Sequence, residues 1–159
     1  MLRTLTILLL PTLIGSMYGQ SSTATQTLQL SVLPVAALSV SGDPQELTVQ
    51  ASDAGDAVLI AEDRSTSYRL SSNRSALKIT ASMNAPLPDG MRLLTRFASS
   101  RGTTVGTVDL GDATTPATVV TSIGKGTEID EEIAYTLIVD SQMTAPSSHQ
   151  RTIIITLTE

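Results

Sequence analysis

The chain has 159 residues, a formal net charge of −5 and no cysteine. A length of this order suits one domain, because compact domains usually contain about 100 to 150 residues. The absence of cysteine excludes disulfide bonds, thiolate nucleophiles and cysteine-ligated zinc, so a hydrophobic core must supply the stability. The acidic balance argues against nucleic acid as a partner.

The beginning of the chain has the layout of a secretory signal peptide. Met1 to Arg3 form a short positive region, Leu5 to Ile14 are apolar, and Gly15 to Gln20 follow with small and polar residues. The apolar run is shorter than the roughly 20 residues that span a bilayer, although a retained membrane helix is the alternative. We expect residues 1–20 to be a signal peptide and 21–159 to form one exported domain. No later stretch is long and apolar enough to span a membrane as a helix. The leader indicates a bacterial periplasmic, cell-surface or extracellular protein.

The residues after the leader have the pattern of an all-β protein. They are rich in Thr, Val, Ile, Leu and Ser, and Gly, Pro, Asn and Asp interrupt them about every eight to twelve residues. We expect an antiparallel, immunoglobulin-like β-sandwich of about 7–10 strands. The expected strands are 25–32, 36–40, 46–51, 57–61, 67–71, 76–83, 91–98, 105–110, 117–122, 133–140 and 151–158. Two of these segments are expected to be halves of one bent strand.

A first hairpin is predicted around the turn-rich segment Asn84 to Gly90. Symmetric pairing about this loop places Lys78 opposite Arg96 and Ser82 opposite Arg92 on the outer face. Alternation then predicts the inward residues, which are Leu77, Ile79, Ala81, Met83, Met91, Leu93 and Phe97.

Basic residues are concentrated on this part of the chain. Between Arg64 and Arg101 there are seven basic residues and a single acid, Asp89, whereas the other acids flank the segment. Because like charges directly opposite destabilise a sheet, negative groups should lie nearby. Either acids of the same domain, such as Asp109, Asp112 or Glu128 to Glu132, balance the basic residues, or the face binds an external anion. The candidate anion-binding or partner-binding residues are Lys78, Arg92 and Arg96.

A second hairpin is predicted from 133–140 and 151–158, which both alternate. Its inward residues are expected to be Ile133, Tyr135, Leu137, Val139, Ile153, Ile155 and Leu157. Symmetric pairing about Pro146 brings Ile138 and Ile154 together on the outward face, where a partner could cover them. We also consider residues 21–29 as a flexible arm that pairs with an exposed strand edge of another copy.

Candidate catalytic and metal motifs are weak in this sequence. His149 is the only histidine, and it is expected to be a solvated loop residue rather than a member of a Ser-His-Asp arrangement. The segments Asp53 to Asp56 and Asp109 to Asp112 could supply calcium ligands but are more simply turns. Residues 122–127 lack the spacing of a phosphate-binding loop, and Asp130 to Glu132 are expected to be a solvated loop.

Seven short segments of strand and turn residues are typical of a known group of proteins. They are SYRLSSN at 67–73, LKITA at 77–81, PDG at 88–90, GTVDL at 106–110, YTL at 135–137, RTI at 151–153 and TLT at 156–158. In these segments the chain resembles small secreted bacterial β-sandwich proteins of unknown function and, more distantly, fimbrial-subunit and spore-coat proteins. The resemblance implies a fold and supplies no catalytic residues.

The function predicted from these features is a non-catalytic one that needs no cofactor. The leading hypothesis is an exported β-sandwich with a structural, adhesion or surface-assembly role, as a homo-oligomer or with another surface protein. The alternative is a module that binds carbohydrate or an anionic glycan, although few aromatic residues are present to stack on sugars. A hydrolase using His149 and a carboxylate is the third hypothesis.

Overall fold

The computed structural model describes residues 26–49, 58–142 and 149–159. The chain divides into two units, Met1–Val32 and Leu33–Glu159. Within the first unit, Gln26–Val32 are described and form neither helix nor strand. The predicted signal peptide lies outside the described residues.

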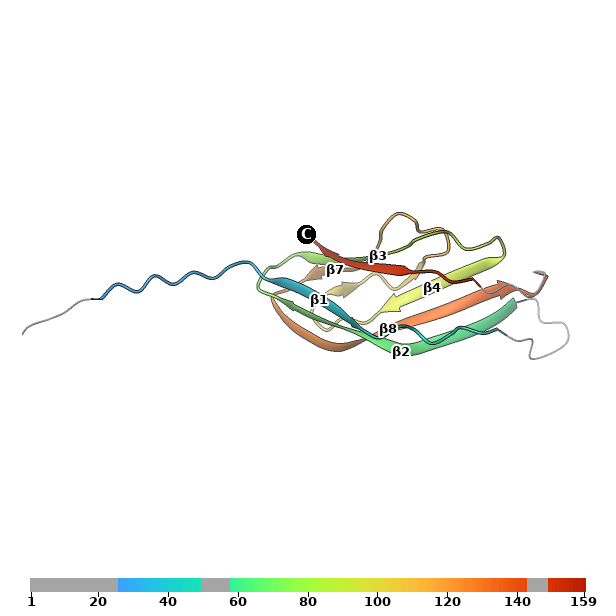
Figure 1. Cartoon of the computed structure of the whole chain (residues 1–159), viewed down its shortest axis with the longest axis horizontal. Helices are drawn as coiled ribbons and strands as arrows, with labels where there is room; N and C mark the ends of the chain where they lie inside the picture. The colour runs from blue at the N-terminus through green and yellow to red at the C-terminus, as the bar shows by residue number, and fades with distance from the viewer. Residues whose placement is uncertain (1–25, 50–57, 143–148) are drawn as a thin grey trace, which may run out of the picture. The chain divides into compact units, whose positions relative to one another are not determined.

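The unit Leu33–Glu159 consists of two antiparallel sheets, and its described residues contain no helix (Figure 1). The predicted all-β sandwich is thereby confirmed. The five-stranded sheet has the order β1 (Ala36–Ser41), β2 (Val58–Ser72), β8 (Gly126–Asp140), β4 (Met91–Phe97) and β6 (Thr107–Asp109). The four-stranded sheet has the order β5 (Thr103–Thr104), β7 (Ala117–Ile123), β3 (Leu77–Met83) and β9 (Ile153–Thr158).

The predicted first hairpin is wrong, because β3 and β4 belong to different sheets. Lys78 pairs with Thr158 of β9, whereas Arg96 of β4 pairs with Ala134 of β8 and Thr107 of β6. The segment between the two strands carries the chain across the core instead of turning it back. Two backbone hydrogen bonds hold this crossover: Met83 N donates to Ala113 O at 2.8 Å, and Leu87 N donates to Gly111 O at 2.8 Å.

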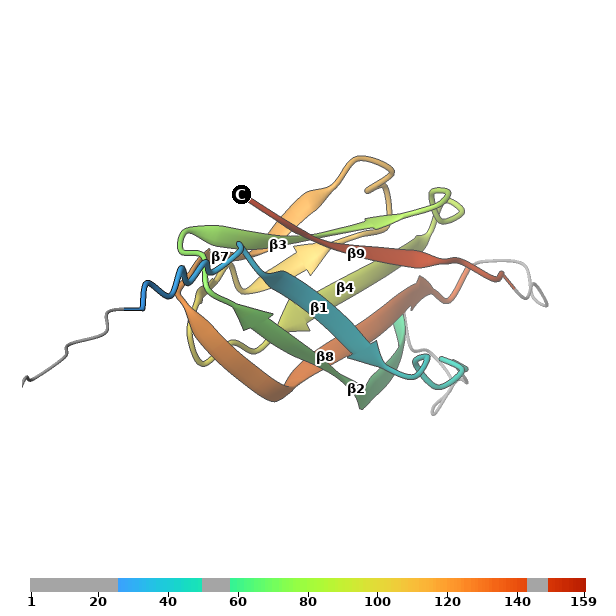
Figure 2. The same cartoon turned by 60° about the vertical axis from the view of Figure 1, so that its left-hand side comes forward.

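The predicted second hairpin is wrong for the same reason. Ile138 of β8 lies between Ile60 of β2 and Arg92 of β4 in the five-stranded sheet, whereas Ile154 of β9 pairs with Ser82 of β3. Figure 2 shows β9 beside β3 at the edge of the four-stranded sheet. The last apolar stretch is therefore a strand of the sandwich, but its partner is β3 rather than β8.

The core lies between the two sheets and contains the alternate residues predicted for it. Tyr68 and Phe97 are fully buried, with their ring centroids 6.0 Å apart. The other buried apolar residues are Leu70, Leu77, Ile79, Ala81, Met83, Leu93, Leu110, Val119, Val120, Ile123, Ile133, Tyr135 and Val139. Ile153, Ile155 and Leu157 pack against this cluster from β9, as predicted. Met91 and Leu137 are only half-buried.

Several expected segments differ from the observed strands. Residues 57–61 and 67–71 belong to one strand, β2, which contains register shifts at Asp63/Thr66 and Tyr68/Leu70, consistent with the expected bent strand. The acidic run at 130–132 lies within β8 rather than in a loop. The described parts of 25–32 and 46–51 contain no strand.

Candidate functional site

A cleft of about 930 Å³ lies in the described part of Leu33–Glu159. Its apolar lining comes from both sheets and consists of Val40, Leu47, Val49, Leu59, Leu87, Met91, Leu93, Leu137, Val139, Ile153 and Ile155. The segment 42–49, which follows β1, also borders it. The cleft was not predicted, because its walls combine strands that are far apart in the sequence.

Uncompensated polar groups lie on the inner side of β2 beside this cleft. Thr66, which lines the cleft, is 2% exposed, and its Oγ1 has no hydrogen-bond partner among the described residues. Asp63 Oδ1 accepts hydrogen bonds from Ser65 N at 3.2 Å and Ser65 Oγ at 2.7 Å, whereas its buried Oδ2 has no partner in the same part of the chain. Buried polar atoms without partners are costly, so the site favours a further hydrogen-bonding group.

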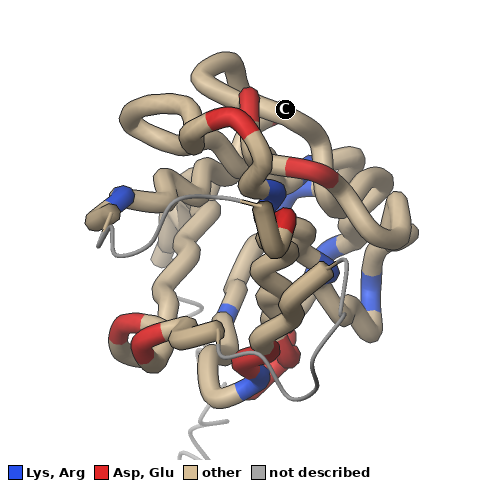
Figure 3. Tube along the Cα trace, turned by 90° about the vertical axis from the view of Figure 1, so that its right-hand side faces the viewer, with Lys and Arg blue, Asp and Glu red and all other residues tan. Residues whose placement is uncertain are grey.

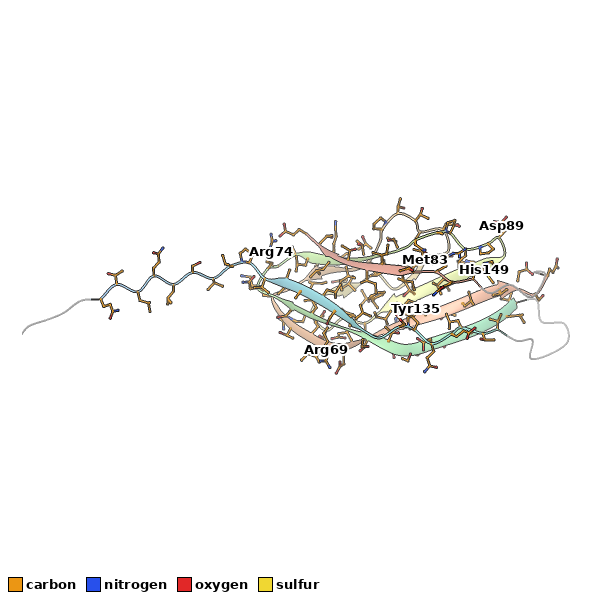
Figure 4. All side chains as sticks on the ribbon, in the orientation of Figure 1. Arg69, Arg74, Met83, Asp89, Tyr135 and His149 are labelled. Atoms are coloured by element: carbon orange, nitrogen blue, oxygen red, sulfur yellow. The ribbon has the colours of Figure 1, made fainter. Side chains whose placement is uncertain are left out.

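Tyr135 of β8 faces the same region (Figure 4). It is 2% exposed and pairs directly with Asp63 across the sheet. Burial, aided by the Asp63 carboxylate, raises the pKa of Tyr135 to about 12. The phenol is therefore neutral at physiological pH and does not act as an acid or base there.

His149 lies at the border of the cleft and is exposed (Figure 4). Asp140 and Ser141 also line this border. In residues 26–49, 58–142 and 149–159, no group of three or more His, Cys, Asp or Glu side chains is arranged to hold a metal ion. Nearby, Arg151 Nε and Nη2 donate to Pro86 O at 3.0 and 2.8 Å, which ties the start of β9 to the crossover after β3.

The structure separates the three predicted anion-binding residues. Arg92 and Arg96 are exposed on β4 of the five-stranded sheet, whereas Lys78 is half-buried on β3 of the other sheet. Arg92 Nε donates to Asp109 Oδ2 at 2.7 Å. Arg96 and Lys78 have no ion pair with a described residue. A single surface containing all three residues is therefore not formed.

Acids from the same domain lie beside several of the basic residues. Besides the Arg92–Asp109 pair, Arg69 Nη2 lies 2.9 Å from Asp130 Oδ1, and Arg74 forms an ion pair with Glu159. Figure 3 shows that basic positions are spread over the view and do not gather into one patch. These contacts support the expectation that the domain balances its own basic segment.

The two predicted interface residues are also apart. Ile154 is 49% exposed on β9, and Ile138 is half-buried on β8. The outward apolar neighbour of Ile138 is Ile60, which is 60% exposed. An apolar spot therefore exists on the outer face of the five-stranded sheet, but it is formed by β2 and β8.

Glu128, which was expected only as one of several acids that balance the basic residues, is a buried carboxylate. It is 1% exposed, and its Oε1 accepts hydrogen bonds from Ser99 Oγ at 2.6 Å and Arg101 N at 2.7 Å. The Tyr68 hydroxyl lies 2.7 Å from Ala98 O and 3.1 Å from Glu128 Oε2, so its single proton can be donated to either acceptor. Burial, with the nearby Glu128 charge, raises the pKa of Tyr68. The arrangement fixes the turn after β4 and is structural.

Gly102 belongs to the same turn. Its N donates to Ser99 Oγ at 2.8 Å, and a Cβ at this position would lie 2.7 Å from Val120 Cγ1 and 2.8 Å from Ile123 Cγ1. These distances are shorter than ordinary van der Waals contacts between carbon atoms. A side chain at Gly102 would thus collide with β7.

The two candidate calcium turns have different outcomes. Asp53 to Asp56 lie outside the described residues. In the other, Asp109 accepts from Arg92 through Oδ2 and from Gly111 N at 2.8 Å through Oδ1. Its carboxylate oxygens are thus engaged in a turn and an ion pair, as the simpler interpretation predicts.

Gln26–Val32, described by themselves, carry an alternating pattern. Leu28, Leu30 and Val32 are 76%, 81% and 87% exposed, and polar residues separate them. An extended segment of this pattern has one apolar face and one polar face. The arm was predicted at residues 21–29, but the alternation continues to Val32.

Comparisons with protein-family models, curated proteins and solved structures find no match to this chain. The resemblance to small secreted bacterial β-sandwich proteins therefore stays a prediction. In the described ranges, no helix has both the length and the apolar character needed to cross a membrane.

Proposed function

We propose that this protein is an exported, non-catalytic β-sandwich that assembles with further copies of itself in a structural or adhesive role at the bacterial surface. The observation that carries the proposal is the exposed alternation of Leu28, Leu30 and Val32. Exposed apolar side chains on an extended segment favour an interaction that removes them from water.

Strand pairing is the interaction that suits this segment. An extended peptide can add to the edge of a sheet, where its backbone supplies hydrogen bonds and its alternate side chains enter pockets. The chain offers both components, because Gln26–Val32 alternate and β9 forms an edge of the four-stranded sheet. The predicted leader supports the exported location.

Self-association is tested by sedimentation velocity of residues 21–159, the chain without its predicted signal peptide. Protein concentrations range from about 1 to about 100 μM. These concentrations cover the typical range of weak and moderate protein affinities. The variant Leu28→Ser/Leu30→Ser is expected to sediment as a monomer under conditions in which the wild type forms larger species. The matched control Gln29→Ala/Ser31→Ala changes the polar face of the same segment and should assemble like the wild type. A wild type that remains monomeric throughout would refute the proposal.

An anionic-glycan-binding module is the second candidate, and Arg96 is the observation that favours it. Arg96 is exposed on the same outward face of β4 as Arg92 and has no acidic partner among the described residues. Stacking on a neutral sugar is less well supported, because Tyr68, Phe97 and Tyr135 are all buried.

A sulfated-glycan column distinguishes this candidate from assembly. Arg96→Glu should elute at lower salt than the wild type if the face binds anions, whereas Lys125→Glu controls for the change in net charge. If Arg96→Glu and Lys125→Glu lower the salt concentration of elution equally, the effect is due to net charge, and a binding site at Arg96 is excluded.

A further inference from the structure

We propose that the cleft between the two sheets binds an aliphatic primary amine, with the ammonium group at Asp63 and Thr66 of β2 and the alkyl chain along the apolar walls. This small-molecule site goes beyond the proposed structural role and does not require self-association. The cleft has a volume of about 930 Å³, which lies within the range of about 300–1,000 Å³ that is usual for ligand pockets.

A bulge in β2 brings two polar side chains to the inner face of the five-stranded sheet. Asp63 pairs with Tyr135 and Thr66 pairs with Ile133, so the register with β8 shifts between Asp63 and Thr66. In a regular strand, residues three positions apart point to opposite faces because side chains alternate. Here both are buried, at 7% and 2% exposure, as are their partners Tyr135 and Ile133. Bulges of this kind re-aim side chains and are common beside functional sites.

The inner end of the cleft has hydrogen-bond acceptors that no described residue uses. Ser65 N and Oγ donate to Asp63 Oδ1 and fix the carboxylate, but the buried Oδ2 has no partner in the described part of the chain. Thr66 lines the cleft, and its buried Oγ1 also lacks a partner there. A buried carboxylate without a partner is costly, and a cation that donates hydrogen bonds removes that cost. An ammonium group has three donors and no acceptor, so it matches these oxygens.

The remaining walls of the cleft suit an unbranched alkyl chain. Tyr135, Leu137 and Val139 alternate along the inner side of β8, and Ile153 and Ile155 of β9 line the cleft from the other sheet. The stretch of β8 from Tyr135 to Val139 is about 14 Å long, so the apolar wall is elongated. An alkyl chain along this wall removes its methylene groups from water.

The charged residues at the cleft favour a cation over an anion. Asp43, Glu46 and Asp140 are exposed and line the cleft, and none of them forms an ion pair with a described residue. Arg151 is the only Lys or Arg in the described lining, and its guanidinium donates to Pro86 O. A cleft lined mainly by acids raises the local concentration of cations. An amine is therefore favoured over a fatty acid of the same length.

Isothermal titration calorimetry of residues 21–159 with matched probes tests the site. Decylamine, decanol and decanoate share one alkyl chain and differ in the head group. Decyltrimethylammonium is cationic but bulky, whereas Asp63 and Thr66 leave little exposed surface for the head group. We expect decylamine to bind at least about tenfold more tightly than each of the other three probes.

Three results with these probes would overturn the proposal. Equal affinities for decylamine and decanol would mean that the cleft selects only an apolar chain. Equal or tighter binding of decanoate or decyltrimethylammonium would contradict a slender, positively charged head group. Failure of all four probes to bind would show that the cleft is not a site for such molecules.

Substitutions in β2 locate the ammonium group. Asp63→Asn keeps the shape of the side chain and removes its charge, so it should weaken decylamine binding about ten- to hundredfold and leave decanol binding unchanged. Glu62→Gln is the matched control, because Glu62 is an exposed acid at the preceding position, and this variant should bind decylamine like the wild type. An equal loss in the two variants would indicate a general charge effect and refute the assignment to Asp63.

Two further variants make the test independent of Asp63. If Asp63→Asn does not fold, as judged by circular dichroism, Thr66→Val removes the other acceptor and should weaken decylamine binding about three- to tenfold. Leu59→Trp narrows the cleft and should weaken decylamine and decanol together. Unchanged decylamine binding in either variant would place the amine elsewhere on the protein, and the assignment to the cleft would fail.

Discussion

Replacing Glu128 by alanine removes the carboxylate that organises the turn after β4. In the folded protein this group is 1% exposed and accepts hydrogen bonds from Ser99 Oγ and Arg101 N, with the Tyr68 hydroxyl 3.1 Å away. In the alanine variant the first two donors lose their acceptor, whereas Tyr68 still donates to Ala98 O. We therefore base the expected cost on two unpaired donors.

Leaving a buried donor unpaired costs about 1–3 kcal/mol, so two donors give about 2–6 kcal/mol. The half-buried Ser99 can turn towards water, and removing a buried charge recovers part of its desolvation energy. We expect a net loss of about 3 kcal/mol for Glu128→Ala. This is a large fraction of the about 5–15 kcal/mol that stabilises a typical domain.

The assay is equilibrium unfolding in urea followed by far-ultraviolet circular dichroism. Glu132→Ala is the matched control, because Glu132 is an exposed acid on the same strand, and its loss should stay within about 0.5 kcal/mol. Glu128→Gln keeps one acceptor oxygen and should fall between the wild type and Glu128→Ala. A loss below about 1 kcal/mol for Glu128→Ala would refute the assignment of a structural role to this carboxylate.

Three further predictions concern backbone space, pH and a surface ion pair. Gly102→Ala should lower the free energy of unfolding by about 1–3 kcal/mol because its Cβ collides with β7, whereas Gly124→Ala, which meets only a contact at 3.8 Å, should be nearly neutral in the same urea assay. Because the folded-state pKa of Tyr135 is raised from 10.0 to about 12, its contribution is complete below pH 10 and is lost as the pH rises to 12; the wild type should lose about 2–3 kcal/mol more than Tyr135→Phe over that range, and parallel losses would contradict this. The exposed Arg92–Asp109 pair should show a coupling below about 1 kcal/mol in a double-mutant cycle, and a larger value would show that the pair is more strongly coupled than its exposure indicates.

Alternation predicted which residues are buried but not how the strands pair. In a sandwich both sheets present their inner faces to the same core, so Leu77 and Leu93 have the same inward pattern although they lie in different sheets. Residues 84–90 contain the proline and glycine that are typical of a hairpin loop, yet this segment crosses between sheets. The predicted burial is therefore correct although the predicted topology is wrong. Burial follows from the two-residue alternation of side chains along a strand and does not depend on which strand pairs with which.

The candidate site was less accessible to sequence reasoning. The arm is one continuous segment, so its residue pattern can be recognised in the sequence alone. The cleft is formed by β9, β8 and β2, which are far apart in the sequence, and can be recognised only once these strands are placed against each other. Glu128 was expected only as one of the acids that balance the basic segment, because it precedes the strand that was predicted to begin at Ile133. Its donors, Tyr68, Ser99 and Arg101, lie on other segments, and no local pattern announces them.

The strands of this protein are shared between the two sheets in an interleaved order. From β2 to β9 the chain changes sheet at every step, and β3 acquires its β9 neighbour only after five other strands have been added. Neither sheet can therefore be completed by a continuous half of the chain. The sandwich should fold and unfold as one cooperative unit with slow, topology-limited kinetics, and no fragment that ends before β8 should retain half of the stability.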